Sequence, residues 1–413
     1  MLKNNTGRSS RFGKPSFARG GGSRNGSSGF KPRMSRGGGF GGGRGKGQSI
    51  SISRFICKAE PVAEKIAYES KNKFADFAIC ELLKENIAAK GYITPTPIQD
   101  QTIPAILNGA DMVGVANTGT GKTAAFLIPL LNKVAANPNE KVLIIVPTRE
   151  LASQINQEFI DFRGALKVFS VCCFGGAYIG QQLQNLKRPH NFVIGTPGRL
   201  KDLVERGAIK LESFTNLVLD EADRMLDMGF VNDMRFIVSK MAPKKQALLF
   251  SATITHEIDS LINEFLTNPI TVSVKTGDTA KNVDQDVVRV GKEDKLDTLH
   301  NMLKLPEFSK VLIFGRTKHG VERLSKTLTE RGIKAESIHG DKNQSGRERA
   351  LRAFKENHSR ILVATDVAAR GLDIPNVSHV VNYDIPATYE DYVHRIGRTG
   401  RGDKTGKALT FID

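Results

Sequence analysis

The sequence has no tryptophan, and its four cysteines, Cys57, Cys80, Cys172 and Cys173, form no CxxC pair. This spacing argues against a disulfide framework or a cysteine-built zinc site and favours a reducing compartment. A run of about 18 apolar residues is also lacking, and no apolar signal-peptide region follows the basic N-terminus. These absences argue against a membrane-spanning or secreted protein and predict a cytoplasmic one without a membrane partner.

Acidic residues are absent from residues 1–48, which contain 11 of the 60 lysines and arginines, 15 of the 40 glycines and 7 serines. Most of the formal net charge of +17 therefore lies in this tail. Its only branched aliphatic residue is Leu2, so burial cannot offset an ordering cost of about 1–2 kcal/mol per residue, and disorder is predicted. Phenylalanines interleave with the cations at Phe12, Phe17, Phe30 and Phe40. This pattern favours salt-sensitive nucleic-acid binding over a tail that only keeps the protein soluble.

From about Phe74 onward, short apolar runs alternate with helix-like stretches. Nine of these runs predict buried strands: KVLIIVPT, NFVIGTP, NLVLDEAD, QALLFSAT, KVLIFGRT, KAESIHG, RILVATD, HVVNYD and KALTFID. Strands that alternate with helices in this way indicate βαβ units and parallel sheets. A polar stretch predicts a linker over residues 275–285, and hence two α/β domains over 74–274 and 286–413.

Two regions lie outside this alternation. Residues 49–73 mix apolar and charged side chains, and no role is assigned to them. The chain stops at Asp413, inside or just after the last predicted strand, which indicates either truncation or a poorly protected sheet edge.

The strongest local motif is ANTGTGKT, residues 116–123, between the strand-like DMVGVA and the helix-like AAFLIPLLNKV. Backbone amides of the stretch Thr118, Gly119, Thr120 and Gly121 would surround phosphates at a helix N-terminus. Lys122 would place a charge on the β- and γ-phosphates, and the Thr123 hydroxyl would bind Mg²⁺. The motif predicts a nucleotide site.

Carboxylates for such a site follow the strand-like NLVLD. Asp220 is the candidate Mg²⁺ ligand, and Glu221 is the candidate base that orients and deprotonates the attacking water. Acidic residues also favour helix N-termini for electrostatic reasons, and without the phosphate loop that alternative would be preferred.

A basic motif, HRIGRTGR, spans residues 394–401. Arg398 and Arg401 are three residues apart, so both can project from one side of a turn or helix toward a transferred phosphoryl group. The alternative is an ordinary phosphate-binding or solvated basic patch, of which His394 forms part.

Eleven short strings occur in a fixed order between Phe74 and Asp413, and together they resemble the DEAD-box RNA helicase family. They are GYITPTPIQ, ANTGTGKT, PTRELA, GG at 175–176, TPGR, DEAD, SAT, LIFGRT, HGDKNQSGR, ATDVAARGLD and HRIGRTGR. The resemblance implies an α/β fold with two tandem RecA-like parallel-sheet domains, of which the first binds ATP and the second is the helicase C-terminal domain.

The resemblance also implies roles at the nucleotide site. Gln99 would read adenine through a bidentate amide pairing, and Phe74 would stack on the ring, with core packing as the alternative for Phe74. Asp373 would contact the ribose, the alternative being an acid that caps a turn.

Further implied roles concern coupling and RNA. The hydroxyls of Ser251 and Thr253 would bridge to Asp223, and His394 would assist this link between nucleotide state and RNA binding. The implied RNA contacts are Thr148, Arg149, Gly176, Thr196, Arg199, Arg316, Gly340, Gln344, Arg347 and Thr365. Hydroxyls, glycine amides and arginines suit phosphates and sugars, so little sequence preference is expected.

The sequence therefore predicts an ATP-dependent RNA helicase, acting as a monomer, that hydrolyses ATP when RNA closes the two domains. Closure would locally unwind short duplexes or remodel RNA–protein complexes, since nothing in the sequence resembles a strand-separating pin. Two alternatives remain at this point. One is a DNA translocase of the same superfamily, and the other is an RNA chaperone or ATP-gated clamp that depends on the basic tail.

Overall fold

The structure is a computed structural model that describes residues 50–59, 68–117, 119–274, 282–291, 294–369, 374, 376–400 and 405–412. The predicted disorder of residues 1–48 lies outside the described residues. So do three predicted site residues, Thr118, Asp373 and Arg401.

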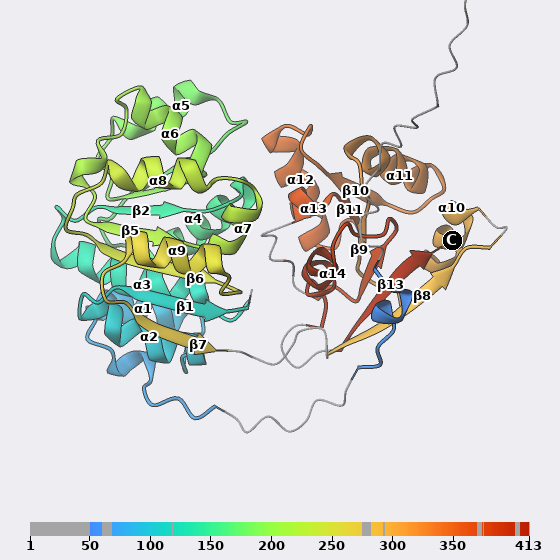
Figure 1. Cartoon of the computed structure of the whole chain (residues 1–413), viewed down its shortest axis with the longest axis horizontal. Helices are drawn as coiled ribbons and strands as arrows, with labels where there is room; N and C mark the ends of the chain where they lie inside the picture. The colour runs from blue at the N-terminus through green and yellow to red at the C-terminus, as the bar shows by residue number, and fades with distance from the viewer. Residues whose placement is uncertain are drawn as a thin grey trace, which may run out of the picture. The chain divides into compact units, whose positions relative to one another are not determined.

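Within the described residues, the first domain is built on a seven-stranded sheet in the order β3-β4-β2-β5-β6-β1-β7 (Figure 1). Every strand pair in it is parallel. Its strands are β1 Met112–Ala116, β2 Val142–Ile145, β3 Ser170–Cys173, β4 Phe192–Gly195, β5 Asn216–Leu219, β6 Gln246–Ser251 and β7 Ile270–Val274.

Helices cover both faces of this sheet because its strands are apolar on both sides. Val142 and Ile144 join the core cluster under α2 to α4, whereas Leu143 and Ile145 join the cluster under α6 to α9. The helices are η2 Phe74–Asp76, α1 Glu81–Ala89, α2 Pro97–Leu107, α3 Lys122–Ala136, α4 Arg149–Arg163, α5 Ile179–Leu186, α6 Pro197–Glu205, η3 Leu211–Ser213, α7 Ala222–Asp227, α8 Val231–Ser239 and α9 His256–Phe265.

The second domain is built on a six-stranded parallel sheet in the order β10-β11-β9-β12-β13-β8, counted over the described residues. Its strands are β8 Val283–Arg289, β9 Val311–Phe314, β10 Ala335–Ile338, β11 Ile361–Ala364, β12 His379–Asn382 and β13 Gly406–Ile412. Its helices are α10 Lys295–Leu303, α11 Lys318–Glu330, α12 Gln344–Lys355, α13 Asp366–Ala369 and α14 Tyr389–Ile396, and a short helix from the N-terminal region, η1 Ile52–Phe55, packs on it.

All nine runs that the sequence analysis named form strands, as does DMVGVA. The strands β3, β7 and β8 were not predicted, because they are only partly buried and less apolar. The linker prediction of 275–285 is wrong at its end, because residues 283–285 already belong to β8, where Val283 and Gln285 are buried on alternate positions. The last strand, β13, is not a sheet edge as expected but lies between β12 and β8. The edge on this side is β8.

Parallel strands all end at the same edge of a sheet, and ligands of open α/β sheets bind beyond that edge. The predicted site residues follow strand ends: Asp220 follows β5, Thr148 follows β2 and Gly340 follows β10. The topology thus collects residues from distant parts of the sequence at one edge of each sheet.

Candidate nucleotide site and nucleic-acid interface

The phosphate loop connects β1 to α3 and depends on two glycines with left-handed backbones. Gly119 has φ 85° and Gly121 has φ 95°, which a residue with a Cβ adopts only with strain. The Thr120 hydroxyl donates to the carbonyl of Asn117 at 2.8 Å and closes the turn. The loop therefore has the compact shape that exposes successive backbone amides to an anion.

Lys122 and Thr123 form the first turn of α3, where the helix dipole is positive. The Lys122 side chain is buried at 7% exposure, and its Nζ donates to the carbonyl of Ala116 at 2.7 Å. The ammonium thus lies next to the end of β1, where the phosphate loop begins, and its contact with phosphates stays a prediction.

Asp220 follows β5 and is 3% exposed. Burial raises its pKa to about 6, against the opposing charge of Lys122 and with a further rise from the neighbouring Glu221. Its Oδ1 accepts the backbone N–H of Glu221 at 2.9 Å. A buried carboxylate beside a lysine under a phosphate loop is suited to a divalent cation, since a cation would supply the missing countercharge.

Glu221 has a left-handed backbone, φ 54°, which is uncommon for a residue with a side chain. It is 4% exposed, and its Oε2 accepts a 2.9 Å ion-paired hydrogen bond from Arg224. Arg224 is a residue that the sequence analysis missed, although the spacing of three residues within a helical turn is a recognisable signal. The strained backbone and the arginine together fix the direction of the Glu221 carboxylate.

Asp223 links α7 to the end of β6. Its Oδ2 accepts the backbone N–H groups of Ala252 and Thr253 at 3.0 and 3.1 Å and the Thr253 hydroxyl at 3.3 Å. The predicted bridge is therefore present for Thr253. It is wrong for a direct bond from Ser251, whose hydroxyl instead donates to the Thr253 carbonyl at 2.8 Å because it lies at the buried end of β6.

The two predicted adenine-binding residues are both buried. Gln99 accepts the Thr96 amide at 2.9 Å and donates to the Gly121 carbonyl at 3.0 Å, so its side chain braces the phosphate loop. Phe74 is 4% exposed and packs edge-on against Phe77 and Tyr92. Core packing, the alternative interpretation, describes this ring, and its stacking on adenine stays a prediction.

Thr123 and Asp220 fit a Mg²⁺ site by donor chemistry, because a hydroxyl and a carboxylate are oxygen ligands that leave coordination positions for water and phosphate. Within the described residues, no group of three or more His, Cys, Asp or Glu side chains is placed to hold a metal ion.

The predicted RNA contacts of the first domain lie at three neighbouring strand ends. Thr148 caps α4 by accepting the Leu151 amide at 3.3 Å, which places Arg149 in the first helical turn. The Arg149 guanidinium lies against Gly176, where a Cβ would be only 1.9 Å from Nη1, so a side chain there would displace the arginine. Thr196 and Arg199 belong to the start of α6, after β4. The five predicted RNA contacts of the first domain therefore lie at one edge of the sheet, beyond the neighbouring strands β3, β4 and β2.

The predicted RNA contacts of the second domain follow β9, β10 and β11. Arg316 is exposed and its amide donates to Asp384 at 2.7 Å, whereas Gly340 is exposed and Thr365 half-buried. Gln344 and Arg347 lie on α12, and Gln344 donates to Glu348 at 2.9 Å.

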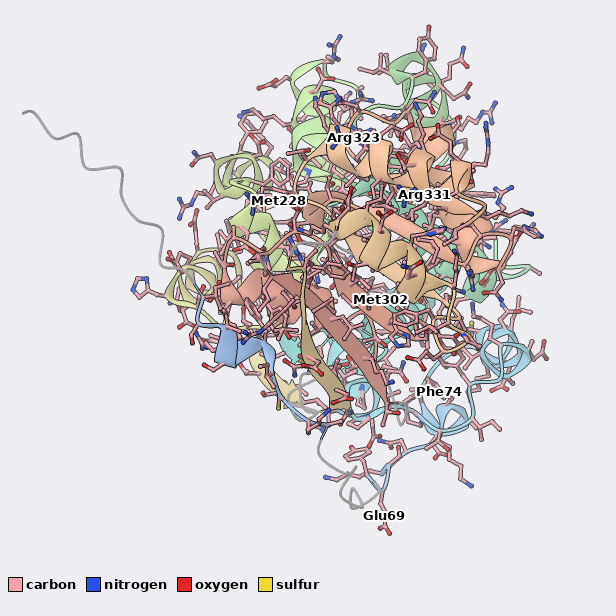
Figure 2. All side chains as sticks on the ribbon, turned by 90° about the vertical axis from the view of Figure 1, so that its right-hand side faces the viewer. Glu69, Phe74, Met228, Met302, Arg323 and Arg331 are labelled. Atoms are coloured by element: carbon pink, nitrogen blue, oxygen red, sulfur yellow. The ribbon has the colours of Figure 1, made fainter. Side chains whose placement is uncertain are left out.

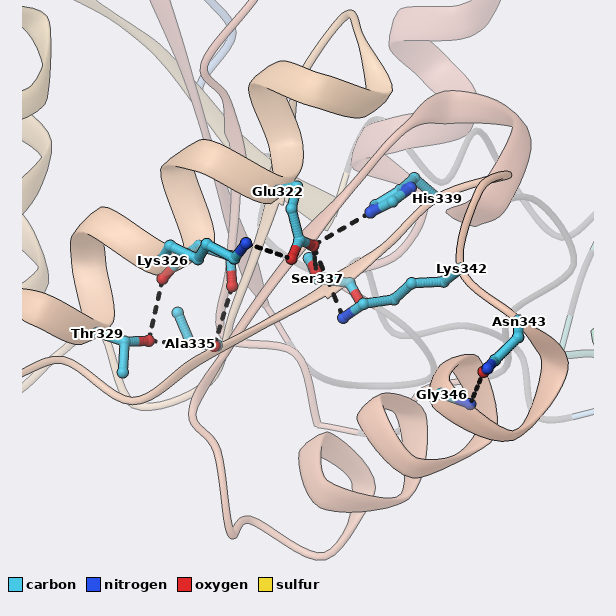
Figure 3. A network of polar contacts seen from close by, with 10 residues as sticks. Glu322, Lys326, Thr329, Ala335, Ser337, His339, Lys342, Asn343 and Gly346 are labelled. Carbon is cyan, nitrogen blue, oxygen red and sulfur yellow. Dashed lines mark hydrogen bonds and ion pairs between the residues drawn. The ribbon is translucent and has the colours of Figure 1, made fainter.

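A polar network supports the loop between β10 and α12 (Figure 3). Glu322 of α11 accepts Ser337 at 2.5 Å and His339 at 3.1 Å, and Lys342 lies 3.9 Å away. The hydrogen bond from Ser337, followed by that from His339, lowers the pKa of Glu322 to about 2 although partial burial opposes the shift. Lys318 pairs with Asp341 of the same loop at 2.7 Å. Sequence reasoning missed this support, because α11 lies outside the recognised strings.

The basic motif begins on α14 and continues into the turn after it. Arg395 donates to both carboxylate oxygens of Asp366 at 2.5 and 2.7 Å, a bidentate pair that the sequence analysis did not anticipate. His394 lies on α14, and Arg398 follows the helix with 3% exposure. Arg395 and Asp366 thus fix the helix that carries the motif.

None of the helices in the described part of the chain is both long and apolar enough to cross a membrane.

Comparison with known proteins matches two family models to the two sheet-containing regions. "DEAD/DEAH box helicase" matches residues 96–261, and "Helicase conserved C-terminal domain" matches residues 294–403. The chain is 46% identical over 341 residues to the DEAD-box ATP-dependent RNA helicase CshA of Bacillus subtilis, covering 82% of this chain and 69% of that one. It is 45% identical over 342 residues to the ATP-dependent RNA helicase CshA of Limosilactobacillus reuteri, covering 82% and 69%.

Solved structures agree in fold. Dbp5 of S. cerevisiae bound to RNA and ADP BeF3 is 30% identical, with a TM-score of 0.72 over 82% of this chain and 89% of that one. The helicase Mss116 bound to ssRNA and UDP-BeF is also 30% identical, with a TM-score of 0.74 over 83% and 76%. The predicted fold class, two RecA-like parallel-sheet domains, is confirmed for the described domains.

Proposed function

Because this chain belongs to the DEAD-box ATP-dependent RNA helicases, which are RNA-stimulated ATPases, we propose which of its residues bind the nucleotide and RNA and which drive hydrolysis. The family assignment supports RNA over DNA as the nucleic acid.

In the first domain, the amides of Thr118 to Gly121 and the ammonium of Lys122 hold the β- and γ-phosphates of ATP. Thr123 and Asp220 hold Mg²⁺, which offsets the phosphate charge when bound. Gln99 and Phe74 select adenine, and Asp373 of the second domain contacts the ribose. The burial of Lys122 and Asp220 and the place of Lys122 at the N-terminus of α3, directly after the phosphate loop, support these assignments.

Glu221 orients the attacking water and accepts its proton. Asp223, Thr253 and His394 couple this site to RNA, with Ser251 acting through its hydrogen bond to the Thr253 carbonyl. The observation that carries the proposal is that Glu221 is buried, left-handed in backbone and paired with Arg224 beside Asp220. A carboxylate held in this way is oriented before the substrate arrives, which is the requirement for positioning a water.

The second domain supplies Arg398 and Arg401 to the charge that develops on the transferred phosphoryl group. Hydrolysis then depends on both domains, and loss of such an arginine costs roughly 10³ to 10⁵ in rate. RNA bound to both rows of contacts brings the domains together: Thr148, Arg149, Gly176, Thr196 and Arg199 on the first, and Arg316, Gly340, Gln344, Arg347 and Thr365 on the second. We propose that the protein acts as a monomer in the cytoplasm. It binds RNA with little sequence preference, because its contacts suit phosphates and sugars.

The test replaces Glu221 by Gln in the full chain. Loss of the proton acceptor should lower RNA-stimulated ATP turnover by roughly 10²-fold or more, while ATP-dependent RNA binding is retained. The matched control is Glu205→Gln, an exposed glutamate at the end of α6, which should leave turnover unchanged.

Parental turnover in Glu221→Gln would show that another group is the base. An RNA-binding scaffold that only clamps would show no multiple-turnover ATPase activity in the parent, with or without RNA. The same assay therefore separates the helicase from the scaffold alternative.

A further inference from the structure

The segment Ile50–Lys58, here named the anchor segment, precedes the first domain in sequence but packs on the second. Phe55, in η1, is 1% exposed and lies in a cluster with Val283 of β8, Tyr392 of α14 and Ala408 of β13. The ring centroids of Phe55 and Tyr392 are 4.8 Å apart, and the rings meet edge-on. A phenylalanine this deeply buried is a fixed part of the second domain's core.

The backbone of the anchor segment also extends the second sheet. The amide of Cys57 donates to the Gln285 carbonyl at 3.0 Å, and the amide of Gln285 donates to the Cys57 carbonyl at 2.7 Å, forming an antiparallel bridge. Gln285 lies in β8, the edge strand, and its side-chain oxygen accepts the Tyr392 hydroxyl at 2.9 Å. Figure 1 shows η1 beside β8 and β13. The segment thus covers part of an otherwise open edge.

Charged contacts flank the buried ring on both sides. The Arg54 guanidinium lies 3.8 Å from the centre of the Tyr389 ring, and Lys58 pairs with Asp284 at 3.3 Å. Aromatic burial, a backbone bridge, a cation–π contact and an ion pair therefore all hold nine residues on one domain.

The next described stretch of the chain, which starts at Tyr68, contacts the first domain. Asp100 of α2 is 3% exposed and accepts the Tyr68 hydroxyl at 2.6 Å, the Lys71 amide at 2.9 Å and the Asn72 side-chain amide at 2.7 Å. Although burial alone would raise it, the pKa of Asp100 is lowered by the hydrogen bonds from Tyr68, Asn72 and Lys71. Glu69, between these contacts, projects into solvent (Figure 2).

We propose that the anchor segment joins the two domains by a second tether, which is covalently continuous with the first domain and docked non-covalently on the second, and that it holds the C-terminal end of the basic tail at the second domain. The first tether is the linker after β7. Ten peptide steps separate Lys58 from Tyr68, and an extended chain covers at most about 3.3–3.6 Å per residue, so this path limits their separation to roughly 35 Å.

Two consequences follow for RNA binding, and they rest on the proposed RNA-stimulated ATPase. A second tether raises the effective concentration of one domain at the other, so less RNA is needed to bring them together. Because the anchor segment begins at Ile50, it also holds on the second domain the point of the chain that follows the basic tail, although the sequence position would suggest the first domain.

The first experiment tests docking. Residues 60–66 of the full chain are replaced by a protease site of equal length, the site is cut, and the products are separated by size-exclusion chromatography. The N-terminal fragment should stay with the rest of the protein. Phe55→Ser should release it, whereas the matched control Ile56→Ser should not, because Ile56 is 49% exposed. Release from the parent after cutting would overturn the proposal, and so would a dimer of the uncut chain by light scattering, which would indicate exchange between copies.

The second experiment measures the concentration of single-stranded poly(U) RNA that half-saturates ATP turnover, before and after cutting. Cutting should raise it by at least about threefold, since one of two tethers is lost while the tail fragment stays docked. An unchanged value would overturn the tether. Absence of RNA stimulation in the uncut protein would instead contradict the proposed function, and the docking readout would still stand.

Discussion

At the scale of single residues, the nucleotide site contains a buried carboxylate, Asp220, whose ionised form is unfavourable until a cation binds. Asp220 is buried with its pKa raised to about 6, so the folded protein holds a proton that the unfolded chain loses near pH 4. Between these values unfolding releases a proton, and stability therefore falls as pH rises from about 4 to about 6. A carboxylate kept at this cost is explained by binding a cation rather than by stability.

Asp220→Asn should therefore stabilise the nucleotide-free protein while abolishing Mg²⁺-dependent ATP turnover. At pH 7.5 the gain should be on the order of 3 kcal/mol, because the amide never ionises but still accepts the Glu221 amide. The gain should shrink toward zero near pH 4. Urea unfolding of variant and parent at several pH values measures it, and a variant less stable than the parent at pH 7.5 would contradict the assignment.

At the scale of elements, helices outside the recognised motifs position the loops that carry them. Glu322 on α11 holds Ser337 and His339 at the end of β10, directly before Gly340 (Figure 3). Its lowered pKa means that this support is complete above about pH 4 and is lost as pH falls toward about 2. At neutral pH the loop is held by a full negative charge.

Glu322→Gln should weaken this support at neutral pH and raise the RNA concentration that half-saturates ATP turnover by roughly 3- to 10-fold, with little change in maximal turnover. Glu330→Gln is the matched control, since Glu330 is exposed at the end of the same helix. Titrations with single-stranded RNA measure the effect. Equal half-saturation in the two variants would show that the network does not position the RNA loop.

At the scale of the whole molecule, the charge is divided between a basic tail and a nearly balanced remainder, since residues 1–48 hold 11 basic residues and no acidic one. Phosphate contacts dominate the salt dependence of nucleic-acid binding. The tail should therefore set affinity at low salt, whereas the domains set the response of ATP hydrolysis to RNA.

Deleting residues 1–48 should lower RNA affinity at low salt by roughly 10-fold or more and flatten the dependence of log Kd on log salt, leaving maximal RNA-stimulated turnover largely intact. A tail of equal length with its lysines and arginines changed to Gln should behave like the deletion, which separates charge from length. Fluorescence-anisotropy titrations over a salt series measure both. Unchanged affinity at low salt would remove the tail's binding role.

Much of this protein could be predicted from sequence because its motifs are local. A phosphate loop needs its glycines and lysine in consecutive positions, and a buried strand needs only a short apolar run, so ANTGTGKT and nine strands were recognisable. Strands that carry polar residues, such as β8, were not predicted, because their burial depends on partner strands that are distant in sequence.

Contacts between distant residues were decided only by the tertiary structure. Nothing in the local sequence pairs Glu322 with His339, or Asp100 with Tyr68, since each pair joins different elements. The placement of Phe55 in the second domain is the clearest case, because its partners lie more than two hundred residues away. Motifs such as the phosphate loop can be recognised from the sequence because they consist of consecutive residues. Which side chains become buried against one another depends on surfaces that only the folded chain brings together.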